Sequence, residues 1–135
     1  MKYYVIAGEP SGDLHGSKLM RGIRNQDPEA SFRFSGGDSM AEVGGKENML
    51  YHYKQMSFFG FVQVAMNLRT IFRQMDDVKA DIERFNPDVI ILIDYPAFNL
   101  RIAKWAKSRN IRVYYYIAPR YGHGRSAALK NYADM

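Results

Sequence analysis

The sequence of 135 residues contains no cysteine, so we expect neither a disulfide framework nor a cysteine-based zinc site. His52 and His123 do not have the spacing of metal ligands, and no metal or other cofactor is expected. Residues 1–7 lack the apolar stretch of a signal peptide, which favours a cytoplasmic location. No apolar run approaches the roughly 20 residues of a membrane-spanning helix, so the chain is not expected to cross a bilayer.

The charge is moderately basic, with 19 lysines and arginines against 14 aspartates and glutamates. A net charge of +5 favours anionic partners, such as phosphorylated ligands or anionic lipid, although an ordinary basic surface explains it equally well. The basic residues are scattered and form no nucleic-acid-binding motif. Nucleic acid is therefore not expected as a partner.

Apolar runs and helical patterns alternate along the chain, and 135 residues with 47% hydrophobic content suit one domain with a real core. This alternation predicts an α/β fold with a doubly wound parallel sheet. The predicted strands span residues 2–7, 31–34, 49–53, 88–93 and 112–117, and the predicted helices span residues 14–24, 39–43, 60–84 and 98–109. Asp13 is predicted to be the N-cap of the first helix.

Two glycine-containing turns should lie at the carboxyl edge of this sheet, where open α/β folds bind ligands. The first turn leads into a helix N-terminus that favours a phosphate or a polar sugar, and Glu9 and Asp13 make hydroxyl recognition the better interpretation. It matches neither a dinucleotide fingerprint nor a P-loop. The alternatives are a plain glycine turn with an N-cap for the first and close backbone packing for the second. The candidate binding residues are Gly8, Glu9, Ser11, Gly12, Asp13, Gly36 and Gly37.

Asp94 follows five apolar strand residues directly, in a partly desolvated position where a carboxyl pKa can rise toward that of a general base. The alternative is that Asp94 only caps the helix that starts near Phe98. Asn99 is a candidate for orienting a substrate hydroxyl, or for satisfying the loop backbone.

Residues 56–68 are more apolar than one buried helix stripe requires. One interpretation is a helix that is buried by a missing neighbour. The other is an interfacial segment whose apolar side enters lipid while arginines meet the headgroups. The candidate membrane-contact residues are Phe58, Phe59, Phe61, Val62, Met66, Arg69 and Arg73.

Several of these segments together resemble the N-terminal portion of the lipid-A-disaccharide synthase family, glycosyltransferases of the GT-B class. The resemblance runs in family order over nearly the whole chain up to Pro119. It is carried by the motifs at residues 7–16 (AGEPSGDLHG), 36–40 (GGDSM), 60–64 (GFVQV), 87–100 (PDVIILIDYPAFNL) and 115–119 (YYIAP).

The resemblance implies an inverting transfer of 2,3-diacylglucosamine from its UDP carrier to the 6-hydroxyl of 2,3-diacylglucosamine 1-phosphate, which forms the lipid A disaccharide precursor and UDP. Asp94 matches the family's essential aspartate and would act as the base, while the glycine turns would line the acceptor side of the cleft. The resemblance also places residues 56–72 on a face that associates peripherally with the inner membrane. The UDP-sugar is a substrate, and no metal is implied.

GT-B enzymes bind the UDP donor mainly with a second lobe, which this sequence does not include, so the isolated chain is not expected to turn over. Residues 1–119 are interpreted as the N-terminal Rossmann-like lobe and residues 120–135 as an aberrant tail. Family members read approximately QVWAWKE where this sequence reads RYGHGRS. Removing the first base of CAG GTA TGG GCA TGG AAG GAG, followed by a pyrimidine, gives AGG TAT GGG CAT GGA AGG AGY, which encodes RYGHGRS. A single-base frameshift at the junction of Pro119 and Arg120 is our hypothesis.

Two other classes of function are alternatives. One is a standalone α/β module that binds a sugar phosphate or a nucleotide without catalysis. The other is an oxidoreductase or methyltransferase domain, against which the missing dinucleotide fingerprint counts. Fold alone does not choose among these classes.

Overall fold

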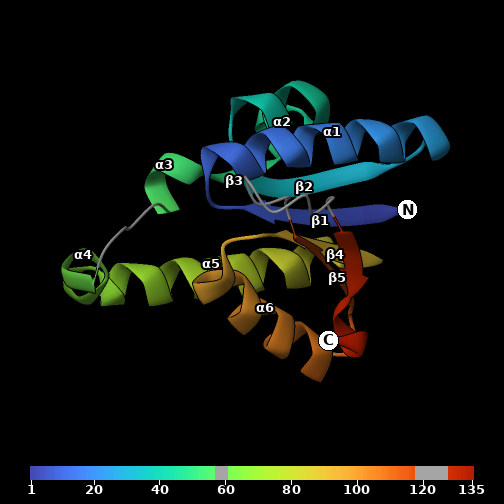
Figure 1. The fold of residues 1–135 in the computed structure, drawn as a ribbon. Coiled ribbons are helices and arrows are strands. Elements are labelled where there is room, and N and C mark those ends of the chain that lie inside the picture. The colour runs from blue at the N-terminus through green and yellow to red at the C-terminus, as the bar shows by residue number, and fades with distance from the viewer. Residues whose placement is uncertain (57–60, 118–127) are drawn as a thin grey trace.

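The computed structural model describes residues 1–56, 61–117 and 128–135. It contains a six-stranded sheet in the order β3-β2-β1-β4-β5-β6, with β1 to β5 parallel and β6 antiparallel to β5. Helices cover both faces of this sheet, α1 and α2 on one side and α5 and α6 on the other (Figure 1). The predicted doubly wound α/β fold is therefore confirmed.

The helices and strands follow the predicted alternation closely. The strands are β1 (Lys2–Ala7), β2 (Ser31–Gly36), β3 (Met49–His52), β4 (Val89–Ile93), β5 (Arg112–Ile117) and β6 (Ala128–Asn131). The α-helices are α1 (Pro10–Gln26), α2 (Asp38–Gly44), α3 (Tyr53–Met56), α4 (Phe61–Met66), α5 (Leu68–Phe85) and α6 (Pro96–Ser108), and 3-10 helices are η1 (Lys46–Asn48) and η2 (Tyr132–Asp134).

Strand β1 contributes to two hydrophobic clusters, because successive side chains of a strand point to opposite faces. Tyr4 and Ile6 join the cluster beneath α5 and α6, while Val5 and Ala7 join the cluster beneath α1 and α2. All four residues are fully buried. This two-sided burial explains why β1 reads as a nearly continuous apolar run.

The order in which successive strands are added to the sheet changes direction at β1, although β1 and β4 are parallel. From β1 the chain moves outward to β2 and β3, and it then returns to the other side of β1 to form β4 and β5. In the paired register, Ala7 lies opposite Ile93, so the next residues, Gly8 and Asp94, leave adjacent strand ends. Open α/β sheets bind ligands at such a switch point.

The predicted role of Asp13 as the N-cap of the first helix is wrong. Helix α1 begins at Pro10, with Glu9 as the flanking residue, so Asp13 lies inside the first turn. Proline is favoured at the first helical position because its fixed φ suits the helix and the missing N–H would be unpaired there. The start therefore falls three residues before Asp13.

The predicted helix over residues 60–84 is also corrected, since α4 and α5 are separated at Asn67. The backbone N–H of Asn67 donates to the carbonyl of Val64, and its Nδ2 donates to the carbonyl of Gln63. Asparagine competes for backbone hydrogen bonds in this way and disfavours helix interiors. The break divides the predicted helix into a helix of 6 residues and one of 18 residues.

The sequence did not predict β6. This strand pairs with β5 from Ala128 opposite Ile117 to Asn131 opposite Tyr114, and it appears in dark red beside β5 in Figure 1. Residues 118–127, which include the proposed junction and the first part of the tail, lie outside the described residues.

Candidate active site

The loops after β1 and β4 contact each other at the switch point. A Cβ at Gly8 would lie 2.6 Å from both Cγ and Cε2 of Tyr95, the residue after Asp94. This distance is far below van der Waals contact, so only glycine allows the ring to pack here. The two loops identified in the sequence are thus one structural unit.

The backbone at Asp94 and Tyr95 adopts the left-handed conformation, with φ of 43° and 51°. Non-glycine residues rarely occupy this region, although aspartate tolerates it better than most. The N–H of Asp94 donates to the carbonyl of Tyr116 at 3.0 Å. The carbonyl of Asp94 accepts from Asn99 Nδ2 at 2.9 Å and from the Tyr115 hydroxyl at 2.6 Å. These contacts hold a strained conformation in place, a feature that is common at functional sites.

Asn99 connects the ends of the two central strands. Its side chain is fully buried, and Nδ2 also lies 3.3 Å from the carbonyl of Ile93 in β4 and 3.4 Å from that of Ile6 in β1. This arrangement supports the backbone-satisfying interpretation of Asn99. Its role toward a substrate hydroxyl stays a prediction.

Two tyrosines near Asp94 have raised pKa values. Burial, together with the negative charges of Asp94 and Glu9, raises the pKa of Tyr115 to about 12. Burial and the charge of Glu9 also raise the pKa of Tyr95. The carboxylates of Glu9 and Asp94 therefore act on the same small region, which is rich in neutral hydroxyl groups at physiological pH.

Asp94 does not occupy the cap position of α6, because the helix begins at Pro96 and Tyr95 flanks it. The capping alternative for Asp94 is thus not the arrangement found. The side chain of Asp94 is half-buried at the edge of the sheet. Its role as a base stays a prediction.

The side chain of Asp13 has a structural role. Its carboxylate accepts backbone N–H groups of Gly37 at 2.8 Å, Ser39 at 3.0 Å and Met40 at 2.9 Å. These are free donors at the start of α2, which Asp13 caps from another helix. A Cβ at Gly37 would lie 2.6 Å from Asp13 Oδ2, so the glycine makes this approach possible.

The other glycines of the predicted site are also closely packed. A Cβ at Gly12 would lie 3.2 Å from the Cβ of Ala7, and one at Gly36 would overlap the side chain of Met40. Close backbone packing, the alternative interpretation of the second turn, is therefore present. Ser11 is exposed and Glu9 is partly exposed, and their contact with substrate stays a prediction.

Tyr95 and Tyr115 were missed as site residues. In β5, Tyr115 lies among three consecutive tyrosines, and alternation along the strand turns it with Val113 toward the cluster of Tyr4 and Ile6. A signal was present in the sequence, since Tyr115 sits near the carboxyl end of the strand beside β4. A hydroxyl group at that position is expected to find a hydrogen-bond partner in the loop after β4, which contains Asp94.

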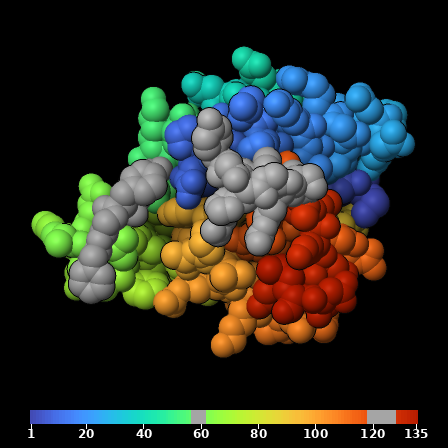
Figure 2. Space-filling view, in the orientation of Figure 1, coloured from blue at the N-terminus to red at the C-terminus, as the bar shows by residue number. Residues whose placement is uncertain are grey.

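Five of the candidate membrane-contact residues lie on α4 and α5 within the described part of the chain. Val62 is 69% exposed and Met66 is 80% exposed, and Arg69 and Arg73 are exposed on the following turns. Phe58 and Phe59 lie outside the described residues, and Phe61 is described only as the start of α4. Figure 2 shows the region of α4 and α5, in green, at one end of the molecule.

Over the described ranges, no helix has the length and apolar character needed to span a membrane. Within the same ranges, no group of three histidine, aspartate or glutamate side chains is arranged to hold a metal ion. Contact of the α4 and α5 surface with lipid stays a prediction.

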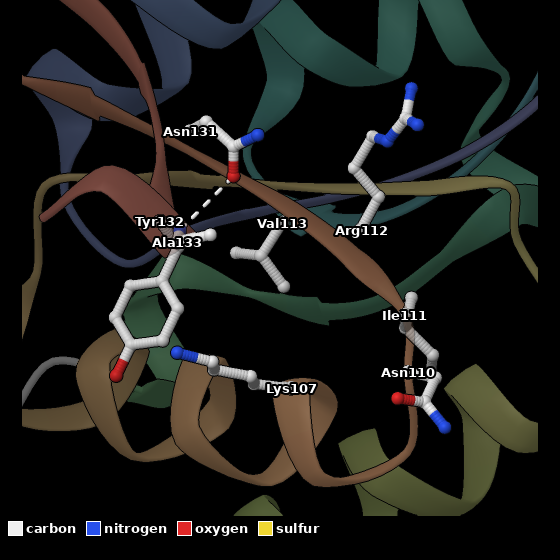
Figure 3. Close-up of a pocket in the computed structure, with 8 residues that line it drawn as sticks. All are labelled: Lys107, Asn110, Ile111, Arg112, Val113, Asn131, Tyr132 and Ala133. Carbon is white, nitrogen blue, oxygen red and sulfur yellow. Dashed lines mark hydrogen bonds between the residues drawn. The ribbon is translucent and has the colours of Figure 1, made fainter.

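A cavity of about 290 Å³ lies at the other end of the sheet, between α6, the start of β5 and η2 (Figure 3). Lys107 and Arg112 line it, and the Oδ1 of Asn131 accepts the N–H of Ala133 at 3.0 Å beside it. It is at the amino end of β5, away from Asp94. We therefore place the candidate site at the carboxyl edge.

Comparison with known proteins gives a consistent result. The family model described as lipid-A-disaccharide synthetase matches residues 3–135. The lipid-A-disaccharide synthase of Coxiella burnetii (strain Dugway 5J108-111) is 34% identical over 133 residues, covering 96% of this chain and 35% of that protein. The Geobacter metallireducens protein of the same name is 37% identical over 131 residues, covering 97% of this chain and 34% of that protein. The chain thus spans about a third of the length of these relatives.

A solved structure gives a likeness in fold alone. It is described as a deacetylase triple mutant involved in teicoplanin biosynthesis, and it has a TM-score of 0.55 and 12% sequence identity. The likeness covers 95% of this chain and 68% of the other.

Proposed function

The chain belongs to the lipid-A-disaccharide synthase family, and from that membership we propose that it forms the acceptor-side lobe of a glycosyltransferase in lipid A biosynthesis. The donor is proposed to be UDP-2,3-diacylglucosamine and the acceptor 2,3-diacylglucosamine 1-phosphate. A second lobe of the GT-B type would hold the UDP group. The protein would act at the cytoplasmic surface of the inner membrane, with α4 and α5 toward the lipid.

The observation that carries this proposal is the position of Asp94. It leaves the sheet at the switch point, beside the Gly8 turn, on a backbone held by Asn99 and Tyr115. A carboxylate in this place is suited to accept the proton of an attacking hydroxyl. The hydroxyl oxygen bonds to the anomeric carbon of the donor, the bond from that carbon to the diphosphate breaks, and its electron pair leaves with UDP.

The substitution Asp94→Asn tests the role of the base. Activity is measured in a chimera in which the C-terminal two thirds of the Geobacter metallireducens relative complete this chain. We expect the rate of disaccharide formation to fall about 10²- to 10⁴-fold, the range for loss of a general base. Because asparagine tolerates the left-handed region, the variant should remain folded, with a change in unfolding free energy below about 1 kcal/mol.

Asp76→Asn is the matched control, since Asp76 is exposed on α5. It should leave the rate unchanged. Full activity of the Asp94→Asn chimera would remove Asp94 from the role of base. A chimera that binds the acceptor but never forms a disaccharide, in any variant, would favour a binding module instead.

The frameshift after Pro119 is a separate proposal about residues 120–135. Two observations bear on it: the family match runs through residue 135, and β6 pairs with β5. The encoding DNA decides it. The shifted frame should read approximately Val-Trp-Ala-Trp and continue into a second lobe, and any other reading contradicts the hypothesis.

A further inference from the structure

An apolar cavity of about 140 Å³ lies directly beside the Asp94 loop. Its walls come from α4, α5 and the first turns of α6, and nearly all of its lining is apolar. The lining residues are Val64, Leu68, Ile71, Phe72, Met75, Tyr95, Ala97, Phe98 and Arg101. The cavity is therefore built jointly by the candidate active-site loop and the helices of the apolar segment.

Tyr95 connects this cavity to the Gly8 turn. Its ring packs over Gly8, stacks against Phe98 at 5.6 Å between centroids, and lines the cavity. Its hydroxyl donates to the carbonyl of Met56 at 2.5 Å, which fixes the ring in place. One aromatic ring thus separates a polar turn, suited to a sugar, from an apolar space, suited to a hydrocarbon.

We propose that this cavity binds a segment of an acyl chain of the acceptor, while the reacting hydroxyl of the same molecule lies at Asp94. This inference rests on the proposed function and adds the position of the lipid tail. An engineered apolar cavity of about 150 Å³ binds benzene, so the space here suits roughly six carbon atoms. It holds the part of the chain nearest the sugar, and the rest extends outward.

The rim of the cavity supports an anionic amphiphile as its occupant. Arg101 is exposed and lines the opening, and it provides a guanidinium for a phosphate or carboxylate group. The protein as a whole is also cationic, with a net charge of +5. An anionic head and a hydrocarbon tail are therefore matched by adjacent features.

The residues that line the cavity differ from the individual candidate membrane-contact residues, although both sets include residues of α4 and α5. On α5, Leu68, Ile71, Phe72 and Met75 follow the spacing of one helix face, and all four line the cavity. The candidate membrane-contact residues Val62, Met66, Arg69 and Arg73 do not line it. Lipid surface and acyl segment are thus assigned to different sides of the same helices.

The first experiment measures binding of hexyl phosphate to this chain by two-dimensional NMR, at concentrations below its aggregation limit. We expect the largest chemical-shift changes at Ala97, Phe98 and Leu68. Ala97→Trp, which places an indole at the cavity rim, should weaken binding at least tenfold. Leu68→Trp fills the space from the opposite wall and should do the same, and unchanged melting temperatures exclude unfolding as the cause.

Val62→Trp is the matched control on the outward surface and should bind hexyl phosphate like the unchanged chain. Binding to vesicles of anionic phospholipid should be unchanged for Ala97→Trp and weakened for Val62→Asp, which places a negative charge on the lipid-facing surface. Shift changes confined to Val62 and Met66, or equal affinity of all variants for hexyl phosphate, would overturn the proposal in favour of a plain lipid-facing surface.

Measurements of KM and kcat distinguish failure of this inference from failure of the proposed function. In the completed chimera, Ala97→Trp should raise the KM for a long-chain acceptor at least tenfold with little change in kcat. Asp94→Asn should lower kcat instead. If Asp94→Asn is inactive but Ala97→Trp leaves the KM unchanged, the acyl site alone is rejected. If Asp94→Asn remains active, the proposed base alone is rejected.

Discussion

Asp13 and Asp94 are both aspartates at the carboxyl edge of the same sheet, and they are held in different ways. The carboxylate of Asp13 is 6% exposed and accepts three backbone N–H groups at the start of α2. Asp94 is anchored through its main chain, by Tyr116, Asn99 and Tyr115. The side chain of Asp13 therefore stabilises the start of α2, whereas main-chain contacts fix the position of Asp94 at the end of β4.

The strongest test of this contrast is Asp13→Ala. The change leaves the N–H groups of Gly37 and Met40 buried without their acceptor, at a cost of about 1–3 kcal/mol each. We expect the free energy of unfolding to fall by about 3–4 kcal/mol in urea denaturation. Asp38→Ala, at an exposed aspartate in the first turn of α2, is the control and should cost less than about 1 kcal/mol. Equal losses for the two variants would contradict the contrast.

Gly8→Ala tests whether the β1 and β4 loops form one unit. The added methyl group would displace the ring of Tyr95 and break its hydrogen bond to Met56. Overpacking of this kind costs about 1–3 kcal/mol, which thermal unfolding measures.

The control is Gly22→Ala within α1, where the added Cβ meets nothing within 4 Å apart from its chain neighbours and the backbone of its own helix. This change should stabilise the chain by about 0.5–1 kcal/mol, because alanine favours a helix more than glycine does. A neutral Gly8→Ala would show that the two loops are independent.

Tyr115→Phe tests the anchor on the carbonyl of Asp94, and we expect a loss of about 1 kcal/mol at neutral pH. The pKa of Tyr115 is raised to about 12 from 10.0, so the folded state favours the neutral phenol. Its stabilising contribution is complete below pH 10 and is lost as the pH rises toward 12. The unfolding free energy of Tyr115→Phe should therefore fall less steeply with pH over this range than that of the unchanged chain. Equal dependence on pH in the two proteins would refute the role of the Tyr115 hydroxyl.

Much of the fold was predictable because it depends on local patterns. Strand β4 is five consecutive buried apolar residues, and such a run between helical segments indicates a buried parallel strand. The position of Asp94 at the carboxyl edge follows from the same pattern. The predicted turn at Gly8 was also correct, since glycine is needed wherever another group packs against the backbone.

The missed features depend on contacts between distant parts of the chain. Asp13 caps a helix that begins 25 residues later, and a cap supplied from another helix has no local signature. The break at Asn67 depends on one side chain competing for a backbone carbonyl. The packing of Tyr95 on Gly8 brings together loops separated by more than 80 residues. Local propensity contains no information about such partners.

The amide of Asn99 has a consequence for how this region can change over time. It reaches the carbonyls of Ile6, Ile93 and Asp94 together, so its distance along the chain from the end of β4 is fixed. A substitution at the exposed residue Pro96 keeps this spacing, whereas inserting or deleting a single residue between Asp94 and Asn99 would pull the amide out of reach of both strands. In laboratory evolution, this loop should therefore tolerate substitutions at exposed positions more readily than insertions or deletions.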